Sequence, residues 1–149
     1  MPDFLLGDSA QCYVAPLVYP ARAKPAVGDF EKLLGGTNAE VQLGENDVTT
    51  KEFDSDLWED GVVAALSWNV PWQGNWRATD PAYAIVESTA LAGIELYLEL
   101  RPMGTGSGLK VWEGVASITG FRHVMPADNI ITNAWTFRGR GPLTPGTQA

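Results

Sequence analysis

The side chains that could perform covalent chemistry are few. The chain has one cysteine, Cys12, and one histidine, His123. A zinc site takes several Cys or His ligands, and nothing in the sequence brings these two residues together as a nucleophile and its base. A Ser-His-Asp arrangement has only His123, in the middle of a predicted strand, to draw on. We therefore expect Cys12 to be a small apolar strand residue and His123 to be a surface or interface side chain.

Two pairs of carboxylates and one glycine-rich loop are the other candidates. Asp54 with Asp56, or Glu59 with Asp60, could serve glycoside hydrolysis, but their acid-rich surroundings are typical of a solvated loop. The sequence GTGSG at 104–108 resembles a phosphate-binding loop, but no Lys-Ser/Thr pair or helix follows it. We predict no catalytic residue, no metal site and no cofactor, and hence a protein that is not an enzyme.

Three tryptophans are candidates for ligand binding rather than for catalysis. Trp68, Trp72 and Trp76 recur on one face of a predicted strand. Exposed, they could stack on sugars, which gives the alternative of a carbohydrate-binding β-sandwich module. Stacking on single-stranded nucleic acid would need a basic groove beside them, and the sequence shows none. We favour packing in the core or in a subunit interface, where aromatic side chains contribute most.

The charge is concentrated in one part of the chain. The net charge is −8, and 12 of the 18 acidic residues but only four of the ten basic ones lie within residues 1–60. From residue 61 onward acids and bases balance. Nucleic-acid binding needs clustered Lys and Arg, so this distribution argues against a protein that grips DNA or RNA.

Length and hydropathy indicate one domain, residues 1–149, with a sizeable core. No apolar run approaches the roughly 20 residues that a membrane span requires. The start, MPDFLLGDSAQC, lacks the basic and apolar regions of a signal peptide. We expect a protein that is made in the cytosol and has no membrane span.

The elements that would position these residues are mostly strands. Apolar and polar residues alternate over 62–76 and 94–101, which predicts strands with one buried face. Pro71 predicts an edge or a bulge. Between these strands, Thr79 or Asp80 can cap a helix that begins at Pro81 and ends at Gly93.

Residues 39–60 predict an extended acidic loop or hairpin that turns at Gly-Glu-Asn-Asp, 44–47. Residues 109–144 predict two long strands around a Met-Pro-Ala-Asp-Asn turn. We predict a mainly β fold: an antiparallel β-sandwich or barrel with one flanking α-helix, the extended loop, an N-terminal arm at 1–9 and a C-terminal arm at 140–149.

Several segments resemble the major tail tube proteins of long-tailed bacteriophages. They are VTTKEF (48–53), LSWNVPWQGNW (66–76), the helix start at Asp80-Pro81-Ala82, GIEL (93–96) and WEGVASITGFRHVMPADNIITNAWTFRGRGPLT (112–144). The last is similar to the family's G-x-A-x-I-T, P-x-D-x-I and F-x-G-x-G-x-L-T ending. The resemblance covers about residues 40–144.

This resemblance implies a structural subunit that forms hexameric rings, stacked into a tube whose lumen conducts DNA into the host cell. The same fold builds the inner tubes of contractile injection and secretion systems. The subunit would be made in the host cytoplasm and reside in the virion tail. Its partners would be other copies of itself, the tape measure and terminator proteins, and DNA only in transit, along a lumen that an acidic chain keeps from sticking.

Two sets of residues follow from the resemblance. The candidate contacts between rings are Glu45, Asp47, Asp54, Asp56 and Trp58. The candidate lumen residues lie on either of two predicted strand faces and are Glu95 and Glu99, or Ser67, Asn69 and Gln73.

Overall fold

The computed structural model describes residues 10–17, 23–50 and 60–148. For residues 45–50 and 60–65 it describes the backbone alone. The elements in these ranges are β1 (Gln11–Pro16), β2 (Glu31–Lys32), β3 (Gly36–Ala39), β4 (Gln42–Thr50), β5 (Asp60–Asn75), α1 (Pro81–Ala92), β6 (Glu95–Arg101), β7 (Lys110–Val124), β8 (Thr132–Gly139) and β9 (Thr144–Thr147). A short 3-10 turn, Val27–Asp29, precedes β2. The prediction of a mainly β protein with one α-helix is confirmed for the described residues.

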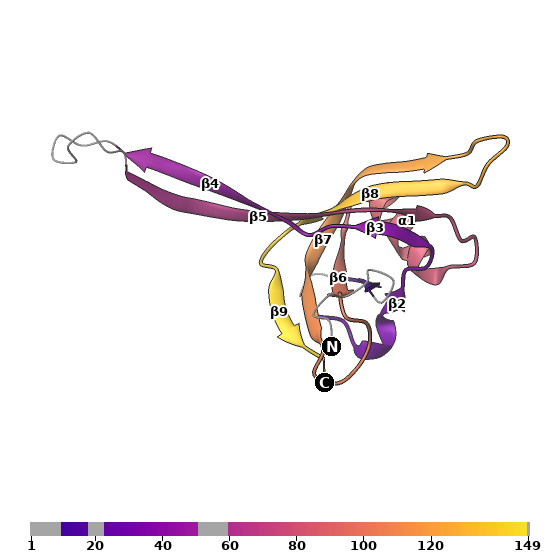
Figure 1. The fold of residues 1–149 in the computed structure, drawn as a ribbon, viewed down its shortest axis with the longest axis horizontal. Coiled ribbons are helices and arrows are strands. Elements are labelled where there is room, and N and C mark those ends of the chain that lie inside the picture. The colour runs from indigo at the N-terminus through magenta and orange to yellow at the C-terminus, as the bar shows by residue number, and fades with distance from the viewer. Residues whose placement is uncertain (1–9, 18–22, 51–59, 149) are drawn as a thin grey trace, which may run out of the picture.

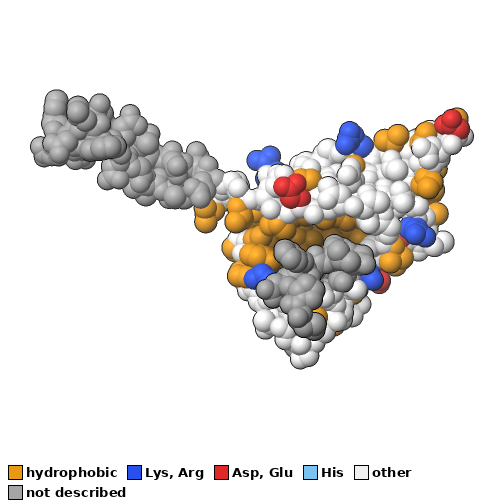
Figure 2. All heavy atoms as spheres, viewed as in Figure 1, with side chains coloured by type: hydrophobic (Ala, Val, Ile, Leu, Met, Phe, Trp, Pro, Cys, Tyr) orange, Lys and Arg blue, Asp and Glu red, His pale blue; other side chains and the backbone are white. Residues whose placement is uncertain are grey.

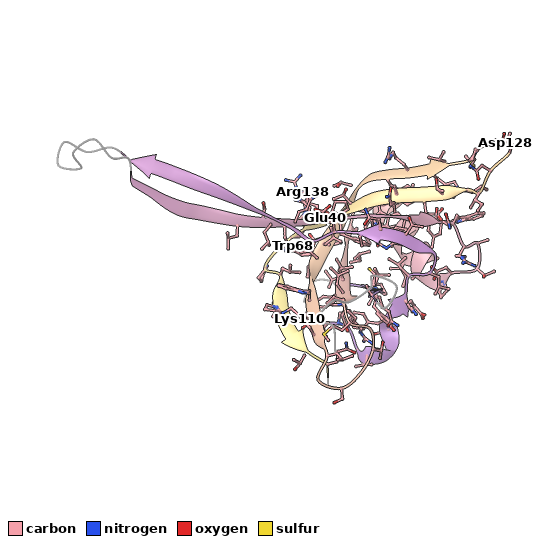
Figure 3. All side chains as sticks on the ribbon, viewed as in Figure 1. Glu40, Trp68, Lys110, Asp128 and Arg138 are labelled. Carbon is pink, nitrogen blue, oxygen red and sulfur yellow. The ribbon has the colours of Figure 1, made fainter. Side chains whose placement is uncertain are left out.

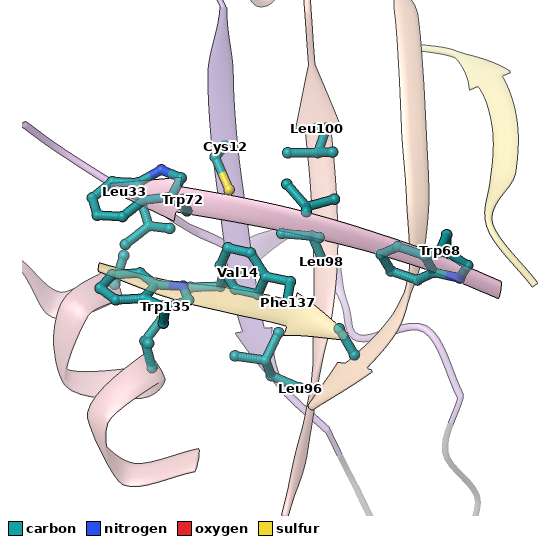
Figure 4. Close-up of a cluster of buried hydrophobic side chains, with 14 residues drawn as sticks. Cys12, Val14, Leu33, Trp68, Trp72, Leu96, Leu98, Leu100, Trp135 and Phe137 are labelled. Atoms are coloured by element: carbon teal, nitrogen blue, oxygen red, sulfur yellow. The ribbon is translucent and has the colours of Figure 1, made fainter. Parts of the chain in front are cut away.

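The strands form one antiparallel sheet that folds over on itself. Its order is β2-β1-β6-β7-β8-β5-β3, with β4 also paired to β5 and β9 to β7. Figure 4 shows β5 and β8 crossing over β1 and β6, with the buried side chains between the two layers. The long strand β7 belongs to both layers, because it pairs with β6 over 112–117 and with β8 over 116–124.

The core is built by the alternation that the sequence predicts. The apolar residues Leu96, Leu98 and Leu100 alternate as buried positions of β6, and every second residue of β5 from Trp68 to Trp72 is buried. The main core residues are Cys12, Val14, Leu33, Trp68, Val70, Trp72, Leu96, Leu98, Leu100, Ala116, Trp135 and Phe137. Trp72 stacks on Trp135, with ring centroids 4.4 Å apart. The interpretation of these tryptophans as packing residues is confirmed.

Trp68 is held at the point where the two layers meet the C-terminal segment. A Cβ at Gly139 would overlap its indole ring, and one at Gly114 would lie 2.8 Å from the ring. Its Nε1 donates a hydrogen bond to the Gly141 carbonyl, at 2.8 Å. The two glycines therefore create the space that this side chain fills.

The helix α1 begins and ends where the sequence predicts. Asp80 is its N-cap, and the carboxylate accepts a hydrogen bond from the Ala82 amide at 3.0 Å. Its other oxygen accepts one from the Leu34 amide at 2.9 Å, which ties the helix to the segment after β2. Gly93 ends the helix in the left-handed conformation, φ 66°.

Pro71 lies opposite an interruption in the neighbouring chain. On one side it pairs with Thr136 of β8. On the other side β3 ends at Ala39 and β4 begins at Gln42, and the Glu40 amide donates to the Pro71 carbonyl. A proline that lacks an amide hydrogen is accommodated at such a break. The predicted edge or bulge is not found there, because β5 has neighbours on both sides and its register continues unshifted from β3 to β4 across Pro71.

The predicted turn at 44–47 is wrong. Residues 42–50 are one strand, which pairs with β5 from Gln42 opposite Asn69 to Thr50 opposite Asp60. A register shift between Asn46 and Asp47 absorbs the irregular sequence as a bulge. The connection between β4 and β5 lies in 51–59, outside the described residues. Figure 1 shows this hairpin projecting far from the body of the molecule.

The C-terminal segment also differs from the prediction. Instead of leaving as an arm, β9 pairs with the start of β7, from Glu113 opposite Thr144 to Lys110 opposite Thr147. Gln148 continues this contact, because its side-chain amide donates to the Gly104 carbonyl at 2.7 Å. The predicted N-terminal arm, 1–9, lies outside the described residues.

Candidate assembly surfaces

One face of the β4–β5–β8–β7 part of the sheet is polar and open. Residues opposite each other in an antiparallel sheet point to the same side, and the register joins Asn69, Arg138 and Ser117 in one row and Gln73, Ala134 and Arg122 in another. We call this surface the polar face. Its members are Gln42, Ser67, Asn69, Gln73, Ser117, Thr119, Arg122, Ala134, Thr136 and Arg138.

The polar face carries charges of both signs. Arg122 and Arg138 are exposed, and Arg140 reaches the same side, where its Nε donates to Ser117 Oγ at 2.9 Å. Glu40, which follows Asn38 of the Gln73 row, and Glu95, which lies opposite Ser117, are acidic residues of this face. Figure 2 shows Lys and Arg side chains along the upper edge of the molecule, and Figure 3 labels Arg138 and Glu40 near the base of the hairpin.

The polar face is hollowed beside Gln73 and Arg122. One hollow of about 190 Å³ is bordered by these two residues, Gly120 and Thr136. A second, of about 180 Å³, is bordered by the same pair with Thr37 and Thr132. Polar groups therefore surround two recesses that are large enough for small polar groups of a partner.

The other set of lumen candidates lies on β6, where Glu95 is opposite Ser117 and so continues the row of Arg138, and Glu99 is opposite Glu113. Glu95 is half-buried, and Glu99 is only 6% exposed, with Oε1 accepting from Arg101 Nε at 2.7 Å. This burial counts against Glu99 as a lumen residue.

The chain itself covers this second surface. Lys24 Nζ lies 2.7 Å from a Glu113 carboxylate oxygen, and this hydrogen bond raises the pKa of Lys24 above its usual value. Phe30 packs edge-on against Tyr97 of β6. The 23–30 segment therefore lies over the outer side of β6 and β7, whereas Ser67 and Gln73 of the polar face are open.

The projecting hairpin has an apolar strip at its base. Leu43 lies opposite Trp68, and Leu66 precedes Trp68 by two residues on the same side. Both leucines continue the core side of the sheet, yet they are 70% and 74% exposed. Nothing among the described residues covers them, which marks the strip as a contact surface.

Two of the five predicted ring contacts lie further out on this hairpin. Glu45 and Asp47 belong to β4, and their side chains are outside those described. Asp54, Asp56 and Trp58 lie outside the described residues. These five stay a prediction.

Two further surfaces could receive a partner. Val124, Met125 and Ile130 are exposed at the β7–β8 turn. A groove of about 510 Å³ opens between the two layers, with Trp72 on one side and Cys12 and Leu100 on the other.

The residues considered for chemistry have structural roles. Cys12 is buried in β1, as predicted, and burial raises the pKa of its thiol far above the usual value, which disfavours the nucleophilic thiolate. His123, predicted to be a surface or interface side chain, is half-buried: its Nδ1 lies 3.2 Å from the Tyr83 hydroxyl, and its ring packs edge-on against Trp76. No cluster of metal-ligating side chains occurs among the described residues. The described part of the chain likewise contains no helix long and apolar enough to span a membrane.

Comparison with known proteins finds similarity in structure and none in sequence families. No family model matches the sequence, and no curated protein matches it. The solved structures that are similar to it include the following three. A chain from the tail of an empty gene transfer agent particle, with C6 symmetry, is 13% identical over 98% of this chain and all of its own, with a TM-score of 0.74. The SPP1 tail tube is 9% identical over 97% of this chain and 80% of its own, with a TM-score of 0.75. A chain of the six-fold symmetrised anti-feeding prophage baseplate is 6% identical over 99% of this chain and 98% of its own, with a TM-score of 0.66.

These likenesses define the fold. It is the antiparallel β fold of subunits that phage-like particles use, and it extends over nearly the whole chain. More narrowly, the chain has the tail tube fold, which confirms the fold that the sequence resemblance implied. The arginines of the polar face were not singled out from the sequence. Their alternation with Ser117, Thr119 and Thr136 was visible there, but the register that joins them was not.

Proposed function

We propose that this protein is a tail tube subunit of a bacteriophage or a related particle. In this proposal it forms hexameric rings, the rings stack into a tube, and the lumen conducts DNA into the host cell. The subunit is made in the host cytoplasm and resides in the virion tail. The tail tube fold, shared over nearly the whole chain, is the observation that carries the proposal. The six-fold symmetry of two of the similar structures supports the ring size.

The polar face is the proposed lumen side. Ser67 and Gln73 are exposed on it and Asn69 is half-buried, whereas Glu99 is buried under its own chain. A water-filled channel favours a continuous surface of hydroxyl, amide and charged groups, because such groups stay solvated. We therefore assign the lumen to Ser67, Asn69 and Gln73 rather than to Glu99, with Glu95 at the β6 end of the Asn69 row.

The hairpin of β4 and β5 is the proposed contact between subunits. The exposed strip of Leu43 and Leu66 would be removed from water by a neighbouring copy. Beyond it, Glu45, Asp47, Asp54, Asp56 and Trp58 are proposed to contact the next ring. The tape measure and terminator proteins are further proposed partners.

Deletion of residues 45–58 tests this function. We expect a folded subunit that cannot polymerise, because the deletion leaves the two layers of the core and removes most of the projecting hairpin. Negative-stain microscopy of the concentrated wild-type protein should show stacked rings of uniform diameter, and the deletion variant should show none. Near-ultraviolet circular dichroism checks that the variant is folded. Normal tubes from the variant would contradict the role of the hairpin, and a wild-type protein that stays monomeric would contradict the proposed function.

The carbohydrate-binding alternative is not favoured. It needs exposed tryptophans, but Trp68 and Trp72 are 4% and 5% exposed, and Trp72 is stacked on Trp135. A sugar cannot reach these rings without opening the core.

A further inference from the structure

Two apolar patches of this protein are exposed at opposite ends of one layer of the sheet. One is the strip of Leu43 and Leu66 at the base of the projecting hairpin. The other, which we call the tip, consists of Val124, Met125 and Ile130 at the β7–β8 turn, and each of these side chains is more than half exposed. Figure 1 shows the hairpin and this turn projecting in opposite directions from the body of the molecule. Among the described residues none covers either patch.

The sheet register sets the distance between the two patches. Val124 lies in one row with Thr132 of β8 and Asn75 of β5. Nine residues of β5 separate Asn75 from Leu66, which corresponds to about 30 Å along a strand. Because paired strands of one layer join the two patches, a subunit cannot bring its own tip to its own strip.

Both patches suit an apolar partner. Within the turn 124–131 the one charged residue is Asp128, and the strand partners of the two leucines are Trp68 and Glu45. Apolar side chains gain free energy when they leave water, and a charge can stay at the hydrated rim of such a contact. Each patch is therefore the kind of surface that the other needs.

The placement of the patches favours a contact between different ends of two copies. A contact of strip with strip, or of tip with tip, is two-fold and ends at a dimer. A contact of the tip with the strip of another copy leaves a free strip at one end and a free tip at the other, so it repeats. With two or three side chains, each patch is small beside the roughly 800 Å² per partner of a stable interface. Several such contacts made together are far stronger than one.

We propose that the tip of one subunit packs on the strip of a subunit in the next ring. This inference rests on the proposed function, because it needs stacked hexameric rings, in which six weak contacts act together. It identifies the surface that covers the base of the hairpin. Successive rings are then joined along the strand direction of the β5–β8 layer, whose two ends carry the tip and the strip.

Cysteine cross-linking tests the contact. Leu43→Cys and Met125→Cys are combined in one chain, and each single variant is a control. Leu43→Cys with Leu91→Cys is the matched pair, because Leu91 is equally exposed on α1, away from the tip. The native Cys12 is buried. A disulfide needs Cα atoms within about 7 Å, so mild oxidation of assembled tubes joins chains where the two patches touch.

We expect the double variant to form tubes and to give, on a denaturing gel without reductant, a ladder of cross-linked chains that extends beyond six. A ladder that stops at six would place the contact within one ring and overturn the inference. Dimers from a single variant would show a two-fold contact and overturn it as well. The same holds for tubes without cross-links, or for an equal ladder from the matched pair.

Oxidation of the wild-type protein keeps the inference testable if the variants do not assemble. Hydrogen peroxide converts an accessible methionine to its sulfoxide, and mass spectrometry follows this change at Met125. The rate in tubes should be at least about tenfold lower than in the unassembled subunit, because the tip is covered. Equal rates would overturn the inference while leaving the tube intact. A wild-type protein that makes no tubes contradicts the proposed function instead.

Discussion

The residue type at some positions of this protein is limited by the space that neighbouring side chains leave, as much as by hydrophobicity. Trp68 is an example, because its indole ring needs the absence of a side chain at both Gly114 and Gly139. The alternation of the sequence places Trp68 on the core side correctly. The two glycines that make room for it come from other strands, and no local pattern relates them to it.

Replacing Gly139 with Ala should destabilise the fold. The new methyl group would overlap the buried Trp68 ring, and overpacking of this kind costs about 2 to 3 kcal/mol. The free energy of unfolding in urea measures the loss. Gly28→Ala is the matched control, since a methyl group there meets no atom within 4 Å. Equal stability of the two variants would show that Trp68 can move aside.

Replacing Asp80 with Ala should weaken two connections at once. The carboxylate caps α1 at the Ala82 amide and also accepts from the Leu34 amide. Loss of the cap costs about 1 kcal/mol, and a second amide without a partner adds about 1 to 2 kcal/mol. Urea unfolding should therefore show a loss of about 2 to 3 kcal/mol. Asp80→Asn retains one acceptor oxygen and should lose less; a smaller loss for Ala than for Asn would contradict the two-bond account.

At the scale of elements, the hairpin of β4 and β5 differs from what the local sequence pattern predicts. The residues Gly-Glu-Asn-Asp at 44–47 have turn chemistry, but pairing with the long strand β5 keeps them extended, with one bulge. The strip of Leu43 and Leu66 is likewise read as core from its alternation, and it is exposed because no second layer reaches it.

Replacing Leu43 and Leu66 together with Ser should separate folding from assembly. Both side chains are exposed in the subunit, so the free energy of unfolding should change by less than about 0.5 kcal/mol. The protein concentration needed for polymerisation should rise at least about tenfold, because a contact that buries the strip loses its apolar area. Sedimentation across a concentration series measures it. Leu91→Ser, at an exposed leucine of α1, is the matched control, and unchanged polymerisation by the double variant would show that the strip stays in water.

The sequence predicts the elements of this fold better than their connections. The α1 caps, the alternation of β5 and β6 and the long β7 and β8 strands all follow from local chemistry. The return of β9 to β7 does not, since Thr-Pro-Gly-Thr has no strand pattern of its own and takes its conformation from the open edge of β7. The burial of Glu99 also does not follow from its sequence neighbourhood, because its strand partners are Tyr13 of β1 and Glu113 of β7.

At the scale of the whole molecule, charge should control the rate of assembly. Subunits of net charge −8 repel each other, and salt at about 0.15 M screens this repulsion beyond about 8 Å. Polymerisation followed by light scattering should therefore accelerate as salt rises from about 0.01 to 0.15 M. Slower polymerisation over that range would indicate that attraction between opposite charges dominates the contacts.

The pairing of β1 with β6 also sets the order of events during synthesis. Cys12 lies opposite Leu100, so β1 leaves the ribosome more than 80 residues before its partner exists. At about 5 to 20 residues per second, that interval is about 4 to 18 seconds. Such distant pairing makes folding slow, and α1, which packs on β1 and β7, cannot be docked until the last third of the chain is made. The subunit therefore completes its core only after β7 and β8 have been made, so nascent chains that have not reached this point present few finished surfaces to each other.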